Sequence, residues 1–118
     1  ADSLDARADR LHETLSCVVR EHLVADVPVA LLLSGGLDSS VLAAMARRLG
    51  PVRTVSMGFA DSALDERPFG RAVSRHLGTD HEEVEIRPEE VTACLEDSAW
   101  YVDDLFGDWG VVTTMVLS

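Results

Sequence analysis

The sequence lacks several features on which common sites and folds depend. It contains no lysine, so all ten basic residues are arginine and the nucleotide loop GxxxxGK[ST] is excluded. The dinucleotide-binding pattern GxGxxG is also absent. The only two cysteines, Cys17 and Cys94, lie far apart without CxxC or cysteine–histidine spacing, which argues against a zinc site. We expect both to be buried, reduced thiols.

Basic residues are scarce as well, since 21 acidic residues oppose 10 basic ones and the formal charge is −11. Such a chain lacks the positive surface by which proteins bind nucleic acid. A nucleotide would have to be held by main-chain N–H groups and a metal ion. No apolar run approaches the roughly 20 residues that span a bilayer, and no signal peptide opens the chain. We therefore expect a soluble, cytoplasmic protein that binds neither nucleic acid nor membranes.

The apolar residues follow helical and strand patterns in turn. Strands are expected over residues 29–33, 52–57 and 81–86. Helices are expected over residues 3–25, from Asp38 or Ser39 to Leu49, over 69–77, around 91–95 and from 108 onward. The first strand is wholly apolar, which suggests cover on both faces, whereas the charged third strand is expected near an edge. The alternation predicts a doubly wound, mostly parallel α/β sheet.

The length of 118 residues suits one domain, with the helix over residues 3–25 leading into a core over residues 28–118. We expect the apolar face of that first helix to comprise Leu4, Leu11, Leu15, Val18 and His22. Only three strands are recognisable, and the chain ends at Ser118 inside an apolar helical pattern. We therefore expect a part of a larger domain. Faces left open by the missing part would favour a homo-oligomer.

The segment SGGLDSS, residues 34–40, separates the first strand from the second helix. Ligands of α/β sheets bind beyond the carboxyl ends of strands, where this segment lies. Its glycines admit an anion to the main chain, and the first-turn N–H groups and dipole of a following helix attract negative charge. The Asp38 carboxylate fits an anion site only if a cation lies between it and the anion, which suggests Mg²⁺. The alternative is a plain loop in which Asp38 caps the helix.

SGGLDSS resembles the SGGxDS pyrophosphate loop of the N-type ATP pyrophosphatases. The longer VPVALLLSGGLDSS is similar to that of the glutamine-dependent asparagine synthetase family. Later segments agree in order: TVSMGF as the second strand, LDERPFGRAVSRHLGTDHEEVEI with the pattern DExxxAxxxAxxLGTxHxEV, and DDLFGDWGVVTTMVLS with DEPFxDxSxxPTxxLS. The resemblance covers roughly residues 15–118 and implies an adenine nucleotide α-hydrolase-like fold.

The resemblance also implies a reaction. A substrate carboxylate attacks the α-phosphorus of ATP, pyrophosphate leaves, and ammonia or an amine then displaces AMP to form an amide. This needs positioning and charge neutralisation but no protein nucleophile. The implied partners are Mg²⁺, ATP, a carboxylate such as aspartate or an analogue, and a glutaminase domain or subunit that supplies ammonia.

Site residues follow from the same resemblance, position by position. The pyrophosphate would be bound by Ser34, Gly35, Gly36, Asp38, Ser39 and Ser40. Asp38 would share Mg²⁺ with another carboxylate, and main-chain groups of Leu33 and Met57 would meet the adenine. An acceptor pocket would include Asp103, Asp104 and Asp108, for which a solvated turn is the alternative.

The chain departs from the family pattern in several places. It has no second acidic loop GxGxDExxxGY, no later catalytic lysine and no glutaminase cysteine. Leu105 and Thr113 replace two prolines, which weakens any transfer of substrate specificity. A β-lactam synthetase or peptide cyclase relative with another carboxylate substrate, or a degenerate nucleotide-binding module, are the alternatives. We expect this chain alone to bind ATP weakly and to be inactive.

Two smaller features have plain structural interpretations. Asp65-Glu66 matches the acidic pair of the family pattern but is also typical of the start of a helix. The four histidines share no metal-binding spacing, and we expect each on the surface or packed on a helix face. They are His12, His22, His76 and His81.

Overall fold

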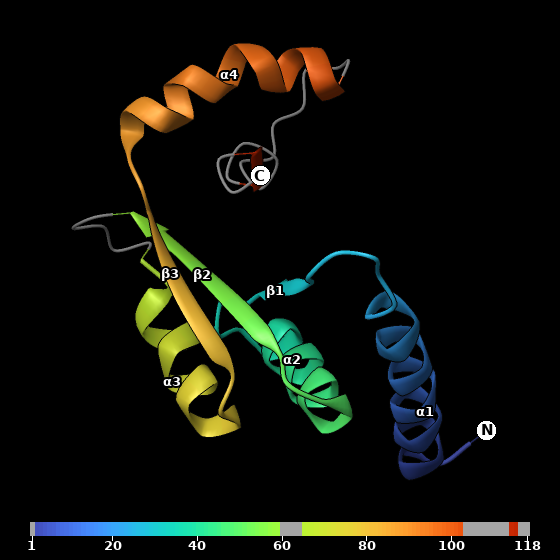
Figure 1. Ribbon diagram of the computed structural model, residues 1–118. Helices are drawn as coiled ribbons and strands as arrows, with labels where there is room; N and C mark the ends of the chain where they lie inside the picture. The colour runs from blue at the N-terminus through green and yellow to red at the C-terminus, as the bar shows by residue number, and fades with distance from the viewer. Residues whose placement is uncertain (1, 60–64, 103–113, 116–118) are drawn as a thin grey trace. The chain divides into compact units, whose positions relative to one another are not determined.

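The computed structural model describes residues 2–59, 65–102 and 114–115. Helices and strands alternate along it, so the protein is α/β, as predicted (Figure 1). The elements are α1 (Leu4–His22), β1 (Ala30–Leu32), α2 (Leu37–Leu49), β2 (Arg53–Phe59), α3 (Arg67–Leu77), β3 (Asp80–Ile86) and α4 (Pro88–Val102). The helix expected from residue 108 lies almost entirely outside the described residues.

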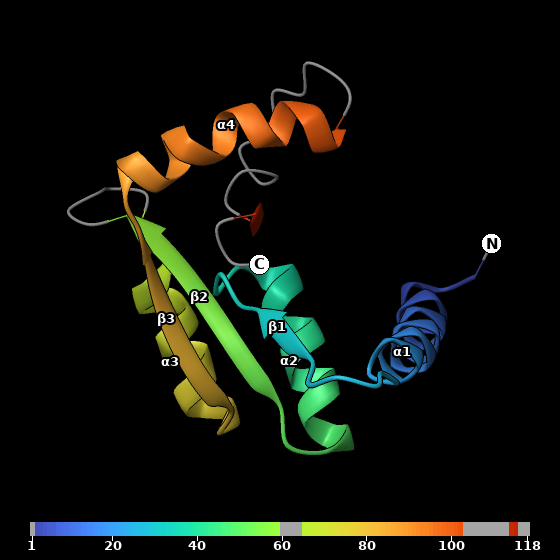
Figure 2. The same ribbon diagram turned by 45° about the horizontal axis from the view of Figure 1, so that its top comes forward.

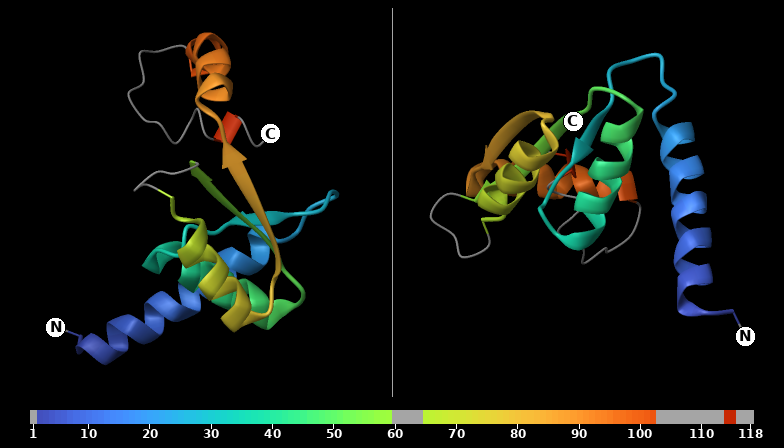
Figure 3. Two further views of the ribbon diagram at one scale, coloured as in Figure 1. Left: turned by 90° about the vertical axis from the view of Figure 1, so that its left-hand side faces the viewer. Right: turned by 90° about the horizontal axis from the view of Figure 1, so that it is seen from below.

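The three strands form one sheet in the order β1-β2-β3. β1 and β2 are parallel, with Ala30 opposite Arg53 and Leu32 opposite Val55. The arrows of β2 and β3 also point the same way, and α2 and α3 lie on one face of the sheet and contact each other (Figure 2). Helix α1 contacts α2 (Figure 3). Among the described strands β3 is at an edge, which confirms its prediction.

The chain divides into two compact units. The first comprises Ala1–Ser56 and Glu66–Glu83 and contains α1, β1, α2, α3 and the beginnings of β2 and β3. The second comprises Met57–Asp65 and Val84–Ser118 and contains the ends of these two strands and α4. The segment SGGLDSS lies entirely in the first unit, so the site is described there.

Small side chains form the contact surface of α2. Ala43 and Ala46 are fully buried, and Ala46 joins Val19 and Val52 in an apolar cluster. Alanines permit close approach of a helix to its neighbours, and larger residues of α2 such as Leu42 and Leu49 remain exposed. Periodicity alone did not distinguish these two groups.

Two expectations about burial were wrong. The predicted apolar face of α1 is largely exposed, with Leu4 at 80% and Leu11 at 60%, whereas the neighbouring Val19 is buried. β1 is not covered on both faces, because Leu32 is 47% exposed. β1 ends the strand order within the described sheet, so its side chains have strand neighbours on one side only. An apolar pattern predicts the face of an element but not what covers it.

The ends of the helices follow their local sequences. Ser3 precedes α1, and its hydroxyl accepts a hydrogen bond from Ala6 N at 3.2 Å. α3 is followed by Gly78, whose φ of +66° is the left-handed conformation typical of a glycine at the end of a helix. Both cysteines are free thiols, but Cys17 is exposed, which contradicts the expectation of burial, and Cys94 is half-buried. Within the described segments, no helix has the length and apolar character to cross a membrane.

Candidate functional site

The segment SGGLDSS forms the connection between β1 and α2. Leu33, which is 1% exposed, precedes it and donates its N–H to the Val55 carbonyl at 2.8 Å. α2 begins at Leu37, one residue before the earliest predicted start, with Gly36 in the N-cap position. No side chain of the described residues caps this helix, so the alternative in which Asp38 is the cap is wrong.

The first turn of α2 is open to a ligand at its main chain. The first helical hydrogen bond runs from Ser40 N to Gly36 O at 3.1 Å. The preceding N–H groups, those of Leu37, Asp38 and Ser39, have no acceptor within the helix. Together with the helix dipole, these groups favour an anion at this position.

The hydroxyl groups of Ser34 and Ser39 form hydrogen bonds within the segment. Gly36 N donates to Ser34 Oγ at 3.2 Å, and Ser39 Oγ donates to Gly36 O at 3.3 Å. Because the Ser39 proton is used there, Ser34 is the donor in the 3.0 Å contact between the two hydroxyls. Ser40 Oγ is buried and has no hydrogen-bond partner among the described residues. Such a group costs about 1–3 kcal/mol, which a ligand atom bonded to it would recover.

Gly35 has two reasons to be glycine. Its φ of +82° lies in the left-handed region, which is unfavourable for residues with a Cβ. A Cβ there would also lie 2.5 Å from the main-chain carbon of Phe69 and 2.7 Å from Gly70 N. The first turn of α3 therefore packs directly on the loop and supports it from one side.

Asp38 lies in the first turn of α2 and is exposed. Within the described segments, no group of three or more His, Cys, Asp or Glu residues could hold a metal ion. Asp38 thus offers one carboxylate beside an anion site. A Mg²⁺ ion that arrives with a nucleotide fits this arrangement, because phosphate oxygens and water can complete its octahedral shell.

The other predicted site residues are less well placed by the structure. Met57 lies in β2 and belongs to the second unit, so its predicted contact with adenine stays a prediction. Asp103, Asp104 and Asp108 lie outside the described residues. Glu66 immediately precedes α3, which agrees with the simple interpretation of the acidic pair as a helix start.

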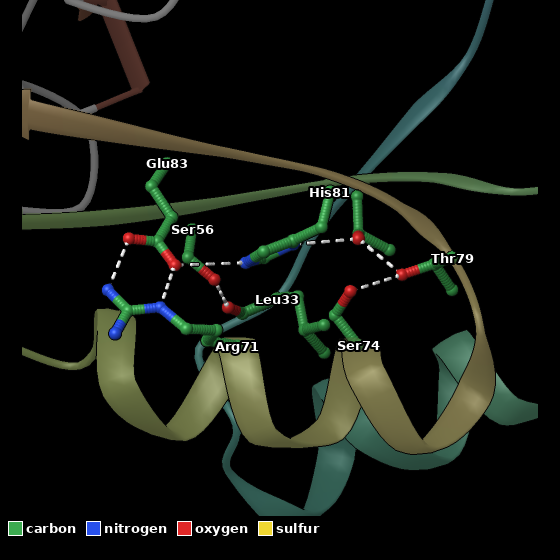
Figure 4. A network of polar contacts seen from close by, with 8 residues as sticks. Leu33, Ser56, Arg71, Ser74, Thr79, His81 and Glu83 are labelled. Carbon is green, nitrogen blue, oxygen red and sulfur yellow. Dashed lines mark hydrogen bonds and ion pairs between the residues drawn. The ribbon is translucent and has the colours of Figure 1, made fainter.

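A polar network between α3 and the sheet was missed in the sequence (Figure 4). Thr54 on β2 is fully buried, and its hydroxyl lies 2.8 Å from Thr79 Oγ1 and 2.9 Å from His81 Nδ1. Thr79 Oγ1 in turn donates to Ser74 Oγ on α3 at 2.9 Å. The His81 side chain is only 10% exposed, so of the two positions expected for it, the surface and a helix face, the surface is wrong.

The network continues to a charged pair. Arg71 on α3 binds Glu83 on β3 through Nε–Oε1 at 2.5 Å and Nη2–Oε2 at 2.6 Å. The hydrogen bonds from Arg71 lower the pKa of the Glu83 carboxyl, against the opposing effect of burial. His81 Nε2 lies 3.8 Å from Glu83 Oε1. The alternation of Thr79, immediately before β3, with His81 and Glu83 on it was a usable signal, because residues two apart in a strand share a face.

Together these features define an α/β protein with a glycine- and serine-rich turn between its first strand and the following helix. The asparagine synthase family matches residues 10–118, and the chain belongs to this family. The resemblance noted in the sequence is thereby confirmed.

Individual relatives agree with this assignment. A provisionally named glutamine-hydrolysing asparagine synthetase of Mycobacterium tuberculosis is 33% identical over 112 residues, which are 94% of this chain and 17% of the relative. Asparagine synthetase [glutamine-hydrolyzing] 1 of Bacillus subtilis is 34% identical over 91 residues, 76% of this chain and 14% of the relative. The amidase chry2 of Gibberella zeae is 32% identical over 115 residues, 84% of this chain and 17% of the relative. The chain therefore spans less than a fifth of the length of these three proteins.

Proposed function

We propose that the chain forms the ATP-binding part of an amide-forming ligase of the asparagine synthase type. The observation that carries the proposal is the open amino-terminal turn of α2, which follows Gly35 and Gly36 and has no side-chain cap among the described residues. Its unpaired N–H groups and the orphaned Ser40 hydroxyl suit the pyrophosphate portion of ATP. Ser34 and Ser39 complete the polar surface of the loop.

Asp38 has the role of a metal ligand in this proposal. The chain carries a charge of −11, and the Asp38 carboxylate by itself would repel a triphosphate. A Mg²⁺ ion between the carboxylate and the phosphate oxygens would remove this repulsion, with a further carboxylate, phosphate oxygens and water as its other ligands. When bound, the ion supplies neutralisation of the charge that develops on the departing pyrophosphate.

The chain's own residues would act by position and polarity. The N–H groups of the first turn of α2 stabilise negative charge on the leaving pyrophosphate, so the α-phosphorus becomes susceptible to attack by a carboxylate. Ammonia or an amine then replaces AMP. Leu33 N is bonded to Val55, and its carbonyl oxygen accepts a hydrogen bond from Ser56, so a contact between Leu33 and adenine would use the second lone pair of this oxygen, with Met57 as the other contact.

The acceptor carboxylate is the less constrained part of the proposal. Aspartate is the substrate that the asparagine synthetases imply, with Asp103, Asp104 and Asp108 near it and ammonia supplied by a glutaminase. A relative with a different name, the amidase chry2, is 32% identical to this chain, against 33% for an asparagine synthetase, so these identities do not restrict the substrate to aspartate. A relative that closes a β-lactam or a peptide ring, or otherwise joins a different carboxylate, is the second candidate.

Calorimetric titration with Mg·ATP tests the nucleotide site. We expect saturable heat with Mg²⁺ and its loss in EDTA. Asp38→Ala removes a charge-assisted interaction worth about 1.5–3 kcal/mol, so affinity should fall about 10- to 100-fold. Asp9→Ala is the matched control, because it removes one exposed acid from α1 and should change nothing. Absence of heat with the unaltered chain, or equal affinities for both variants, would refute the proposal.

A further inference from the structure

Ser56 is placed to hold the start of the segment over residues 34–40, which we call the phosphate loop after its proposed function. It lies on β2, is 1% exposed, and its hydroxyl donates to the main-chain carbonyl of Leu33. The strand register that pairs Leu32 with Val55 brings Leu33 opposite Ser56, and Leu33 is the residue immediately before Ser34. Leu33 thus has its N–H bound to Val55 and its carbonyl bound to Ser56. The peptide groups before and after Leu33 are therefore both held in one orientation where the chain leaves the sheet.

Gly70 on α3 makes room for this hydrogen bond. A Cβ at position 70 would overlap with Ser56 Oγ and lie 2.5 Å from the Leu33 carbonyl oxygen. The family pattern DExxxA, which begins at Asp65, has alanine where this chain has Gly70. The space of that alanine methyl group is occupied here by the Ser56 hydroxyl. Gly70 is therefore a departure from the pattern with a direct structural reason.

The same turn of α3 contacts the loop a second time. The main chain of Phe69 and Gly70 lies against Gly35, close enough that a Cβ at position 35 would approach Phe69 at 2.5 Å. α3 consequently presses on the loop at Gly35 and on its origin at Leu33. A shift of the Leu33 carbonyl would therefore disturb the contacts of α3 at both Leu33 and Gly35.

We propose that Ser56, with the space provided by Gly70, is a positioning residue that holds the phosphate loop in its binding conformation before the nucleotide arrives. The inference rests on the proposed nucleotide site. Ser56 acts through the Leu33 carbonyl and needs no contact with the nucleotide. Loss of its hydroxyl leaves that carbonyl without its side-chain donor, so part of the binding energy must then order the loop.

Ser56→Ala in the full chain tests this role through two measurements. Calorimetry with Mg·ATP should show affinity reduced about five- to tenfold, which corresponds to one lost hydrogen bond. Hydrogen exchange of the amides of residues 35–39 without nucleotide should become faster. Ser74→Ala is the matched control, because Ser74 is 3% exposed, lies on α3 and loses a hydroxyl contact to Thr79, away from Leu33. It should lower thermal stability without changing either measurement.

A second pair of variants tests the space at position 70. Gly70→Ala should impair Mg·ATP binding more than Ser56→Ala, and the double variant should recover part of that loss because the overlapping hydroxyl is gone. Additive effects would overturn the pairing of these residues. Unchanged affinity and unchanged loop exchange in a folded Ser56→Ala variant would overturn the inference while leaving the nucleotide site intact. If the unaltered chain fails to bind Mg·ATP, the proposed function fails, and the exchange measurement still decides whether Ser56 orders the loop.

Discussion

Arg71 and Glu83 are joined by two parallel hydrogen bonds, Nε to Oε1 at 2.5 Å and Nη2 to Oε2 at 2.6 Å. The planar guanidinium matches the carboxylate in this arrangement, so the pair is geometrically specific. It links α3, whose first turn packs on the loop over residues 34–40, to β3. A contact remote from the loop therefore helps to hold the helix that supports it.

The Arg71–Glu83 pair predicts an acid-sensitive contribution to stability. Hydrogen bonding from Arg71 lowers the pKa of Glu83 below its ordinary value of 4.5, so the folded state favours the ionised carboxyl. The contribution is present above pH 4.5 and is lost as the pH falls through the lowered folded-state pKa. Arg71 is 44% exposed, so solvent screening limits the effect to about 0.5–1 kcal/mol. The free energies of urea unfolding of the unaltered chain and of Glu83→Gln should differ by this amount at pH 7 and converge as the pH falls below the folded-state pKa of Glu83.

Glu82→Gln provides the control for this measurement. Glu82 also pairs with an arginine, Arg53, but through a single contact at 2.7 Å and with both side chains more than half exposed. Its replacement should cost less than that of Glu83 at pH 7. If the two variants lose equal stability, the paired geometry at Glu83 has no special effect.

Gly35 and Gly36 should respond very differently to alanine. Gly35→Ala meets both an unfavourable φ of +82° and a main-chain overlap with Phe69, and should cost at least about 2 kcal/mol of unfolding free energy. Gly36 has φ of −67°, and its Cβ would lie 3.3 Å from Ser34 Oγ, so Gly36→Ala should cost less than about 1 kcal/mol. Chemical unfolding and Mg·ATP titration of both variants test this order. Equal losses would show that the α3 contact does not constrain the loop.

The position of the loop could be predicted because local chemistry determines it. Glycines and serines between an apolar run and a helical pattern indicate a turn at the carboxyl end of a strand, and Gly78 likewise marks the end of α3. These features depend on residues adjacent in sequence. The start of α2 at Leu37 differed from the expectation by a single residue.

Burial and side-chain partners could not be predicted in the same way. Leu4 and Leu11 fit a helical apolar stripe, yet they are exposed because burial depends on which element lies opposite. His81 meets Thr54, which is 27 residues away in sequence, and no local pattern records that pairing. Ser56 has the pattern of an ordinary strand residue, and its role depends on the proximity of Gly70, which is distant in sequence.

The hydroxyl chain around His81 predicts which ring nitrogen carries the proton in the neutral imidazole. Thr79 uses its proton on Ser74, so Thr54 must donate to Thr79 in their 2.8 Å contact. Thr54 then has no proton left for His81, and the 2.9 Å contact requires His81 Nδ1–H as the donor. Nitrogen NMR at about pH 9, where an ordinary histidine is neutral, should therefore show the proton on Nδ1.

Thr54→Val provides the decisive variant for this tautomer, because valine has a similar shape but accepts no hydrogen bond. With that acceptor removed, the proton should move to Nε2, which lies 3.8 Å from Glu83 Oε1 and has no hydrogen-bond partner among the described residues of the unaltered chain. The exposed His12 and His76 are internal references whose signals should stay unchanged. A proton on Nε2 in the unaltered chain would reverse the direction of the hydroxyl chain. The Nε2–H of His81 would then face the Glu83 carboxylate on the same strand, and Thr54 would be the donor to Nδ1.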